Sequence, residues 1–302
     1  MQIGGNIRRY DLFTDGTVIN ENPAGDTPGN RVKIDEFGFY LQAGKPMIND
    51  RLKVTASIRY DENENFKGQF SPRVSAIFSP DWERNHNFRA SYQTGFRNPA
   101  TQQQFIFFQQ ADAILLGSAK ANAERYGVHE GGAYTNSSYN AFLQSVIGGQ
   151  PNPLLLEQVS IPYVQPERLQ VYELGYKGLI EHKLLVDLNG YYNRYRDFIA
   201  QQTVRARSGA SHQGKYLPGV DDMLAGTASN ATGFELYVNS PEIVTSFGAG
   251  IGLTYEIARG FQVYGHYNYT TFDVEDPNPD FEPRCNMPEN KFLFGFANRK
   301  LL

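Results

Sequence analysis

The chain repeatedly alternates between apolar and polar residues, and the stretch "RLKVTASIRY" at 51–60 shows this most clearly. Its even positions are apolar or aromatic, and its odd positions are polar or charged. Side chains of a β-strand point to opposite faces in turn, so this stretch predicts a strand with one apolar and one hydrophilic face. A one-residue shift in pairing would move Lys53 and Arg59 to the apolar face, so the register should be strongly enforced.

The same period-two pattern recurs along most of the chain, for example at 36–44, 87–96, 247–257, 261–270 and 291–299. Such repeated alternation predicts an all-β fold, an antiparallel up-and-down sheet of about ten strands. The predicted strands are residues 2–13, 33–45, 50–61, 69–79, 86–97, 167–179, 183–206, 230–257, 260–275 and 287–300.

The connections between these strands alternate in length. The short ones fall at 45–50, 79–85, 180–182 and 258–260, and the longer ones at 14–32, 62–68, 98–166, 207–229 and 276–286. To keep this order, 230–257 must be one long strand bent around Ser240-Pro241, because two strands there would break the alternation. The sheet is therefore predicted to have one plain end and one elaborated end.

Two architectures are consistent with this pattern. A soluble β-sandwich or barrel would bury the apolar face against a second sheet. A transmembrane β-barrel would turn it toward lipid, and a strand of about ten residues spans the apolar band of roughly 25 Å. The longest predicted strands exceed the ~5–6 residues usual in soluble sheets, and their polar faces carry bulky charged residues such as Arg51 and Arg89. These features favour the membrane barrel.

Composition narrows the classes of partner and site. The formal net charge of −4 gives no basic footprint, so we predict no nucleic-acid partner. No apolar run of about 18 residues is present to form a membrane helix. Cys285 is the single cysteine, which excludes a disulfide framework. The first residues lack the features of a secretory signal, and the text begins and ends within strand-like sequence, so we expect a fragment.

Residues 98–166 form the longest predicted connection. They contain amphipathic text at 103–127 and 138–149 that is compatible with helices. A connection of this length in a compact domain normally counts against an element assignment unless it is functional. On a soluble protein it would be an inserted subdomain. On a barrel it would be a folded extracellular loop inserted between strands of a single domain, 1–302.

Three loop stretches supply candidate ligand contacts, "FIFFQQ" (105–110), "GGAYTNSSYN" (131–140) and "SHQGKYLPG" (211–219). Their aromatic rings and amides are suited to stacking on sugars or planar chelates. The alternative, weighted equally, is that these aromatics pack on one another and hold the loops in place. The candidate residues are Phe107, Phe108, Tyr134, Tyr139, His212 and Tyr216.

Other chemistry finds little support. "GAGIG" at 248–252 lacks the lysine and helix of a phosphate loop, so its glycines are predicted to lie in a strand on the polar face. His129-Glu130 and Asp221-Asp222 are interpreted as solvated loop charges, because no further ligand stands at metal-site spacing. Lone serines such as Ser91 have no nearby histidine to activate them. We therefore predict no cofactor, no metal site and no enzyme activity.

Several stretches together resemble TonB-dependent outer-membrane receptors. "QFSPRVSAIFSP" (69–80) and "NFRASYQTGFRNPATQQQF" (87–105) resemble consecutive strands of that family, the second ending in T-G-F-R before a proline. "QPERLQVYELGYKGLI" (165–180) and "LLVDLNGYYNRYRDFI" (184–199) resemble its next hairpin, and "NMPENKFLFGFANRKL" (286–301) is similar to a late strand. The ordered set covers most of the chain.

This resemblance implies a wall segment from a barrel of about 22 strands. It implies a Gram-negative outer-membrane importer of a scarce ligand, which is a ferric siderophore, haem, cobalamin or oligosaccharide. A periplasmic TonB-type protein would energise import through a plug domain that this sequence does not show. The alternatives are a passive or specific porin, and a soluble β-rich carbohydrate-binding or adhesin module.

Overall fold

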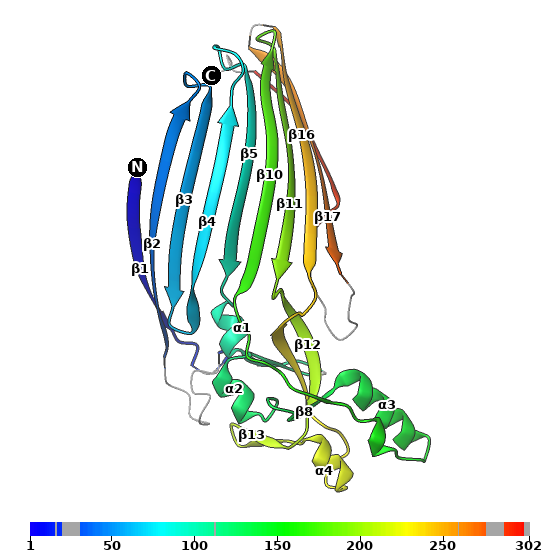
Figure 1. The fold of residues 1–302 in the computed structure, drawn as a ribbon. Helices are drawn as coiled ribbons and strands as arrows, with labels where there is room; N and C mark the ends of the chain where they lie inside the picture. Colours follow the sequence, from blue (N-terminus) through cyan, green and yellow to red (C-terminus); the bar gives the residue numbers. More distant parts are fainter. Residues whose placement is uncertain (16, 20–30, 112, 259, 276–286, 299–302) are drawn as a thin grey trace.

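The main body of the molecule is one ten-stranded antiparallel sheet, called the wall below (Figure 1). The computed structural model describes residues 1–15, 17–19, 31–111, 113–258, 260–275 and 287–298. Each wall strand pairs with its predecessor and successor in the wall, which confirms the predicted up-and-down sheet of ten strands. They are β1 (Gln2–Leu12), β2 (Val32–Met47), β3 (Leu52–Asn63), β4 (Phe66–Phe78), β5 (His86–Arg97), β10 (Glu167–Ile180), β11 (Leu184–Arg196), β16 (Val244–Ala258), β17 (Phe261–Val274) and β18 (Asn290–Asn298).

The two ends of the wall differ. Short turns at 48–51, 79–85 and 181–183 lie at one end, called the turn end, as predicted. The opposite end, called the loop end, carries the longer connections (Figure 1). The long connection predicted at 62–68 was wrong, because only Glu64 and Asn65 separate β3 from β4. The Asn63 side-chain oxygen accepts from the Asn65 amide at 2.9 Å, which closes a tight turn.

A second layer, called the loop layer, lies beyond the loop end and consists of residues 98–166 and 197–243 (Figure 1). Its six-stranded sheet has the order β6-β7-β15-β12-β8-β9, and a hairpin and four short α-helices accompany it. The strands are β6 (Phe107–Gln109), β7 (Ile114–Leu116), β8 (Ala133–Thr135), β9 (Gln158–Val159), β12 (Ile199–Ala206), β13 (Ala210–His212), β14 (Lys215–Leu217) and β15 (Gly233–Asn239). The helices are α1 (Thr101–Phe105), α2 (Lys120–Arg125), α3 (Asn136–Ile147), α4 (Val220–Leu224) and a 3-10 turn at Pro153–Leu155.

The helical text of the insertion is only partly helical. The stretch 138–149 lies mainly in α3, as predicted, whereas 103–127 is divided between α1, β6, β7 and α2. Among the residues that the structure describes, no helix combines the length and apolar character needed to cross a bilayer.

The prediction of single long strands at 183–206 and 230–257 was wrong. The first is split at Asp197-Phe198 into β11 and β12, and the second at 240–243 into β15 and β16. Asp197 takes a positive φ of 55°, which turns the chain out of the wall. Beyond the break, β12 and β15 pair with each other in the loop-layer sheet, so the alternation of short and long connections in the wall is still kept.

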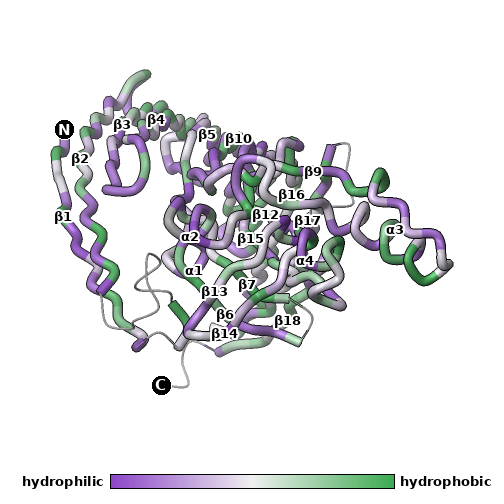
Figure 2. The backbone as a smooth tube through the Cα atoms, turned by 90° about the horizontal axis from the view of Figure 1, so that it is seen from below, coloured by the Kyte–Doolittle hydropathy of each residue, from purple (hydrophilic) through white to green (hydrophobic). Residues whose placement is uncertain are grey.

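The two faces of the wall have different chemistry, and hydrophilic and hydrophobic residues alternate along its strands (Figure 2). Apolar side chains on one face stay exposed, including Phe88 at 49%, Leu174 at 68% and Phe294 at 78%. The three buried apolar clusters of the described residues lie in the loop layer or at the loop end. No second sheet of the described residues lies against the apolar face of the wall, which is the arrangement of a membrane barrel rather than of a sandwich.

The other face is polar and charged, as expected for the lumenal side of a barrel wall. Arg89 and Lys177 flank Asp187 at 3.5 and 3.8 Å. Small residues make room for large neighbours on this face, since a Cβ added to Gly248 would lie 2.3 Å from the Tyr191 ring. The glycines of 248–252 at even positions therefore belong to a strand on the polar face, as predicted. The sheet is an open segment, with β1 and β18 at its two edges.

Candidate ligand-binding site in the loop layer

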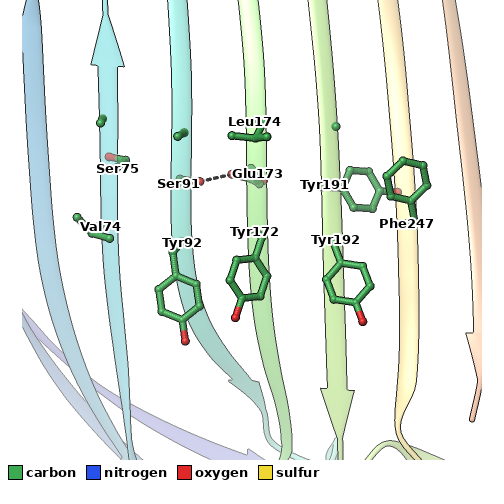
Figure 3. A pocket seen from close by; sticks show the side chains of 13 residues that line it. Val74, Ser75, Ser91, Tyr92, Tyr172, Glu173, Leu174, Tyr191, Tyr192 and Phe247 are labelled. Carbon is green, nitrogen blue, oxygen red and sulfur yellow. Dashed lines mark hydrogen bonds between the residues drawn. The ribbon is translucent and has the colours of Figure 1, made fainter.

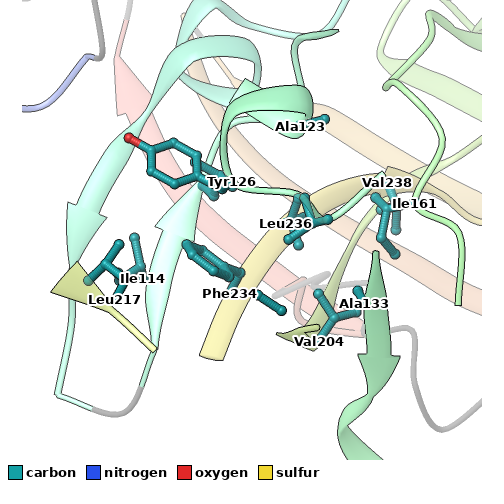
Figure 4. Packing of buried hydrophobic residues seen from close by; sticks show 13 residues of the cluster. Ile114, Ala123, Tyr126, Ala133, Ile161, Val204, Leu217, Phe234, Leu236 and Val238 are labelled. Carbon is teal, nitrogen blue, oxygen red and sulfur yellow. The ribbon is translucent and has the colours of Figure 1, made fainter. Parts of the chain in front are cut away.

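The loop layer has a compact apolar core of its own (Figure 4). Val204 of β12 and Leu236 of β15 are fully buried, and Ile114 and Leu116 of β7 pack beside them. Strand β7 comes from the 98–166 insertion and runs parallel to β15. The insertion is thus joined by backbone pairing to the strands that extend from β11 and β16, which gives these loops a rigid scaffold.

Asn239 fixes the junction between the wall and the loop layer. Its side-chain amide donates to the carbonyl oxygens of Gln165 at 2.9 Å and Asp197 at 2.7 Å. Its side-chain oxygen accepts from the Gln165 amide at 2.7 Å. Asn239 therefore satisfies backbone groups that lose their strand partners where β11 ends, and it ties the end of the insertion to the same point.

Phe107 and His212 are brought together by the structure. Their rings stack with centroids 3.6 Å apart, and the Phe107 ring lies 5.2 Å from that of Tyr126. The His212 Nδ1 and the Tyr126 hydroxyl form a hydrogen bond of 2.7 Å. Both candidates are half-buried, and their contacts connect the β13–β14 hairpin to the insertion.

Phe108 and Tyr216 are the two most accessible candidates, at 48% and 56% exposure. Adjacent strand residues point to opposite faces, so Phe108 points away from the contacts that Phe107 makes. The Tyr216 hydroxyl donates to the Asp222 carboxylate at 2.9 Å. This hydrogen bond raises the pKa of Tyr216, with smaller contributions from burial and the Asp222 charge. Tyr216 therefore remains a neutral donor at physiological pH.

Tyr134 and Tyr139 lie inside a separate small cluster with Val220 and Ala231. They are only 7% and 1% exposed. The Tyr139 hydroxyl donates to the Asn230 side-chain oxygen at 2.7 Å and accepts from the Ala231 amide. These two tyrosines thus hold α3 against the segment before β15, and they do not open toward solvent.

A cavity of about 250 Å³ lies between the β6–β7 and β13–β14 hairpins and the segment before β15. Its polar lining includes Gln109, Arg205, Lys215, Tyr216 and Asn230. No carboxylate is among the described residues that line it, and two of those residues, Arg205 and Lys215, are cationic. The cavity can therefore accept an anionic group.

Both charged side chains of its described lining, Arg205 and Lys215, are held in place by contacts. The Arg205 guanidinium donates to the Asn136 side chain at 3.2 Å and to the Ala231 carbonyl at 3.1 Å, and it lies 4.8 Å from the centre of the Tyr139 ring. The Lys215 ammonium lies 3.5 Å from the Gln109 side-chain oxygen. Tyr139 is thus linked to this cavity through Arg205.

The described residues that line the cavity include none of the acidic and histidine pairs noted in the sequence, but Asp222 contacts the lining residue Tyr216. His129 Nδ1 lies 2.7 Å from the Ile161 carbonyl, and the Asp222 carboxylate accepts from Gly219 and Tyr216. Among the residues that the structure describes, no three His, Cys, Asp or Glu side chains are grouped as metal ligands.

Sequence reasoning did not select Gln109, Arg205, Lys215 or Asn230. Gln109 and Lys215 stand inside stretches that were chosen for their aromatics, so a search for cations beside those aromatics would have found Lys215. Arg205 carried no such signal, because it lay near the end of a predicted wall strand, 183–206.

The chain matches the family model described as TonB dependent receptor-like, beta-barrel, over residues 2–297. It is 30% identical over 117 residues to a hemoglobin-haptoglobin utilization protein B of Neisseria meningitidis, which covers 32% of this chain and 14% of that protein.

Solved structures show the same fold at low identity. The FrpB iron transporter of Neisseria meningitidis superposes with a TM-score of 0.50 at 12% identity, over 90% of this chain and 32% of that one. A mutant of the ferric enterobactin receptor PfeA of Pseudomonas aeruginosa superposes with a TM-score of 0.55 at 15% identity, over 89% and 32%. The chain thus spans about a third of these structures.

Proposed function

Because the chain belongs to the β-barrel family of TonB-dependent receptors, we propose that it forms part of a Gram-negative outer-membrane importer. In this proposal the wall contacts membrane lipid, and the loop layer faces the exterior and captures a scarce ligand. A periplasmic TonB-type protein energises import by acting on the plug of the whole receptor. Family membership is the observation that carries the proposal, and the unlike faces of the wall support it.

A receptor that captures a scarce ligand outside the cell and releases it inside needs an energy source. A loop site that binds a scarce ligand tightly also holds it tightly, and equal affinity in every state would never release it. Work done on the plug supplies the difference in affinity between capture and release. The wall does no chemistry in this scheme, and it provides a rigid aqueous conduit.

We assign the cargo to the class of anionic iron chelates, which includes ferric siderophores and haem. The cavity beside Tyr216 is lined by Lys215 and Arg205 and by no carboxylate of the described residues, so it favours a negatively charged group. The exposed ring of Phe108 is suited to stacking on a planar chelate. A neutral oligosaccharide or cobalamin would gain less from these cations.

The six aromatic candidates divide into two roles in this proposal. Tyr216 contacts the ligand from within the cavity lining, and Phe108, which is exposed but not among the lining residues, contacts the part of the ligand outside the cavity. Phe107, His212, Tyr134 and Tyr139 position the loops, because their contacts lie within the loop layer.

Uptake by cells that carry the full-length gene tests the proposal. A deletion strain is supplied with ⁵⁵Fe-labelled anionic siderophore, ⁵⁵Fe-haem, labelled cobalamin or a labelled oligosaccharide, with and without a functional TonB gene. We expect uptake of an iron chelate that requires both the receptor and TonB. Uptake that persists without TonB would identify a porin. A protein that stays soluble without detergent would instead support a carbohydrate-binding or adhesin module.

Charge reversal at Lys215 tests the cargo class. Lys215→Glu should raise the half-saturating concentration of the anionic chelate by about tenfold, since it replaces attraction by repulsion. Lys120→Glu is the matched control, because Lys120 is an exposed lysine of α2 that pairs with Glu124 at 3.7 Å and lies outside the cavity lining. Equal effects of the two changes on the half-saturating concentration would contradict the assignment.

A further inference from the structure

The lipid-facing surface of the wall contains a trough made by small side chains. Ala76, Ala90, Gly190 and Ala249 occupy one register level across β4, β5, β11 and β16, with Leu174 of β10 between them. Larger side chains stand on both sides of this level along the strands. The result is two adjoining apolar cavities of about 560 and 520 Å³, one on each side of Leu174.

A row of tyrosines borders the trough toward the loop end (Figure 3). Tyr92, Tyr172 and Tyr192 are cross-strand neighbours, with ring centroids 5.0 and 6.3 Å apart. Figure 3 shows their hydroxyl groups pointing in the same direction, away from the small residues of the trough. Each ring thus presents an apolar body to the trough and a polar tip toward the loop end.

Three arginines continue the same face beyond the tyrosines. Arg194 pairs with Gln170, and Arg196 pairs with Arg168, at two and four residues past the Tyr172–Tyr192 pair. At ~3.4 Å per residue these positions lie about 7 and 14 Å farther along the strands. Strand alternation places all three arginines on the side that carries the tyrosines.

The charge of this group is only partly neutralised. Arg168 lies 3.9 Å from Asp197, which is the one salt bridge of the three arginines to any described residue. In the row of Arg194, the next acidic residue is Asp273, two strands away across Thr245. Arg194 and Arg196 therefore leave a net positive patch on a surface that faces outward from the wall.

From this order of chemistry we propose that β5, β10 and β11 bind a phosphorylated lipid of the leaflet at the loop end. One acyl chain lies in the trough, the tyrosine hydroxyls donate to the ester or sugar oxygens, and the arginines bind the phosphate. The sequence of apolar trough, hydroxyl row and guanidinium group reproduces the order of tail, linker and headgroup in such a lipid. Arginine suits the last step, because its planar fork donates two hydrogen bonds to phosphate.

Phosphate dependence is the first test. Full-length receptor in detergent is titrated with diphosphoryl lipid A or with the same lipid after removal of its phosphates, and bound lipid is counted by native mass spectrometry. We expect the phosphorylated form to bind at least about tenfold more tightly. Equal affinity for the two forms would overturn the proposal.

Two pairs of variants locate the site. The triple change Arg168→Gln, Arg194→Gln and Arg196→Gln should abolish the preference for phosphate. Its control, Lys53→Gln, Arg73→Gln and Arg89→Gln, removes equal charge from the lumenal face and should retain the preference, with Lys177 still beside Asp187. Loss of the preference in both triples, or in neither, would contradict the assignment.

Filling the trough tests the acyl-chain part of the site. Gly190→Leu should weaken binding of both lipid forms, because the leucine side chain fills the trough. The wall has room for the change, since a Cβ at Gly190 has only the Gly248 carbonyl oxygen within 4 Å, at 3.7 Å. Gly95→Leu is its lumenal control, because a Cβ at Gly95 meets no atom within 4 Å. Each variant is first checked for native, heat-modifiable gel mobility. If the triple variant of Arg168, Arg194 and Arg196 fails to fold, Arg196→Gln alone replaces it. Unchanged lipid binding by Gly190→Leu would refute the proposed path of the chain.

Discussion

Replacing Leu188 with arginine would place a charge on the lipid-facing surface near the middle of the bilayer. Leu188 stands four residues from the start of β11 at the turn end, which is about 14 Å along a strand that crosses a ~25 Å apolar band. An arginine at this depth of a membrane barrel costs about 2–4 kcal/mol. The equilibrium between folded and unfolded receptor should therefore shift by roughly 30- to 700-fold toward the unfolded form.

The neighbouring position supplies the control. Asn189 lies on the lumenal face, where its side chain covers Gly250 and the Asp187 carboxylate is nearby on the same face. Asn189→Arg should therefore change stability by less than about 1 kcal/mol. Both variants are refolded into lipid vesicles and unfolded with guanidinium, and the folded fraction is read from heat-modifiable gel mobility. A larger loss for Asn189→Arg than for Leu188→Arg would mean that the two faces have been assigned the wrong way round.

Three further predictions address the loop layer, the turn end and the lumenal face. Leu236→Ala should destabilise the loop layer by about 2–5 kcal/mol, because its side chain is fully buried, and limited proteolysis should then cleave this layer while the wall stays protected. Burial alone would raise the pKa of Asp81, but the backbone amides of Asn85 and His86 donate to its carboxylate and hold the pKa below its ordinary value. The ionised carboxylate therefore stabilises the folded state fully above about pH 4, and this contribution is lost as the pH falls further. Asp81→Asn should flatten that part of the curve of stability against pH. Gly248→Ala should cost about 1–3 kcal/mol by displacing the Tyr191 ring, and a double variant with Tyr191→Ala should lose this penalty; additive effects would rule out the contact.

The wall was predictable from sequence because its signal is local. Alternation in β3 or β16 reports directly which side chains lie on the apolar face, and each wall strand pairs with strands that share this pattern. The short turns at 79–85 and 181–183 also carry clear signals in their polar residues. The polar stretch at 62–68 was predicted to be a long connection, but the Asn63 side chain permits a two-residue turn there.

The loop layer was less predictable because its structure depends on contacts between distant segments. Nothing local in 199–206 distinguishes β12 from a continuation of β11, since both are extended and alternate. The break depends on Asn239, whose side chain binds the backbone at Gln165 and Asp197 from far along the chain. The same reason hid the cavity, which joins Gln109, Lys215 and Asn230 only after folding.

Consecutive spin labels along β10 would test the central claim, that one face of the wall meets lipid and the other faces water. Single cysteines at positions 172 to 177, in full-length receptor with Cys285→Ser, are labelled in lipid vesicles and probed with oxygen and a water-soluble nickel chelate. The account predicts greater collision with oxygen at Tyr172, Leu174 and Tyr176, and greater collision with nickel at Glu173 and Lys177. Accessibility without this two-residue period, or with the two faces exchanged, would contradict it.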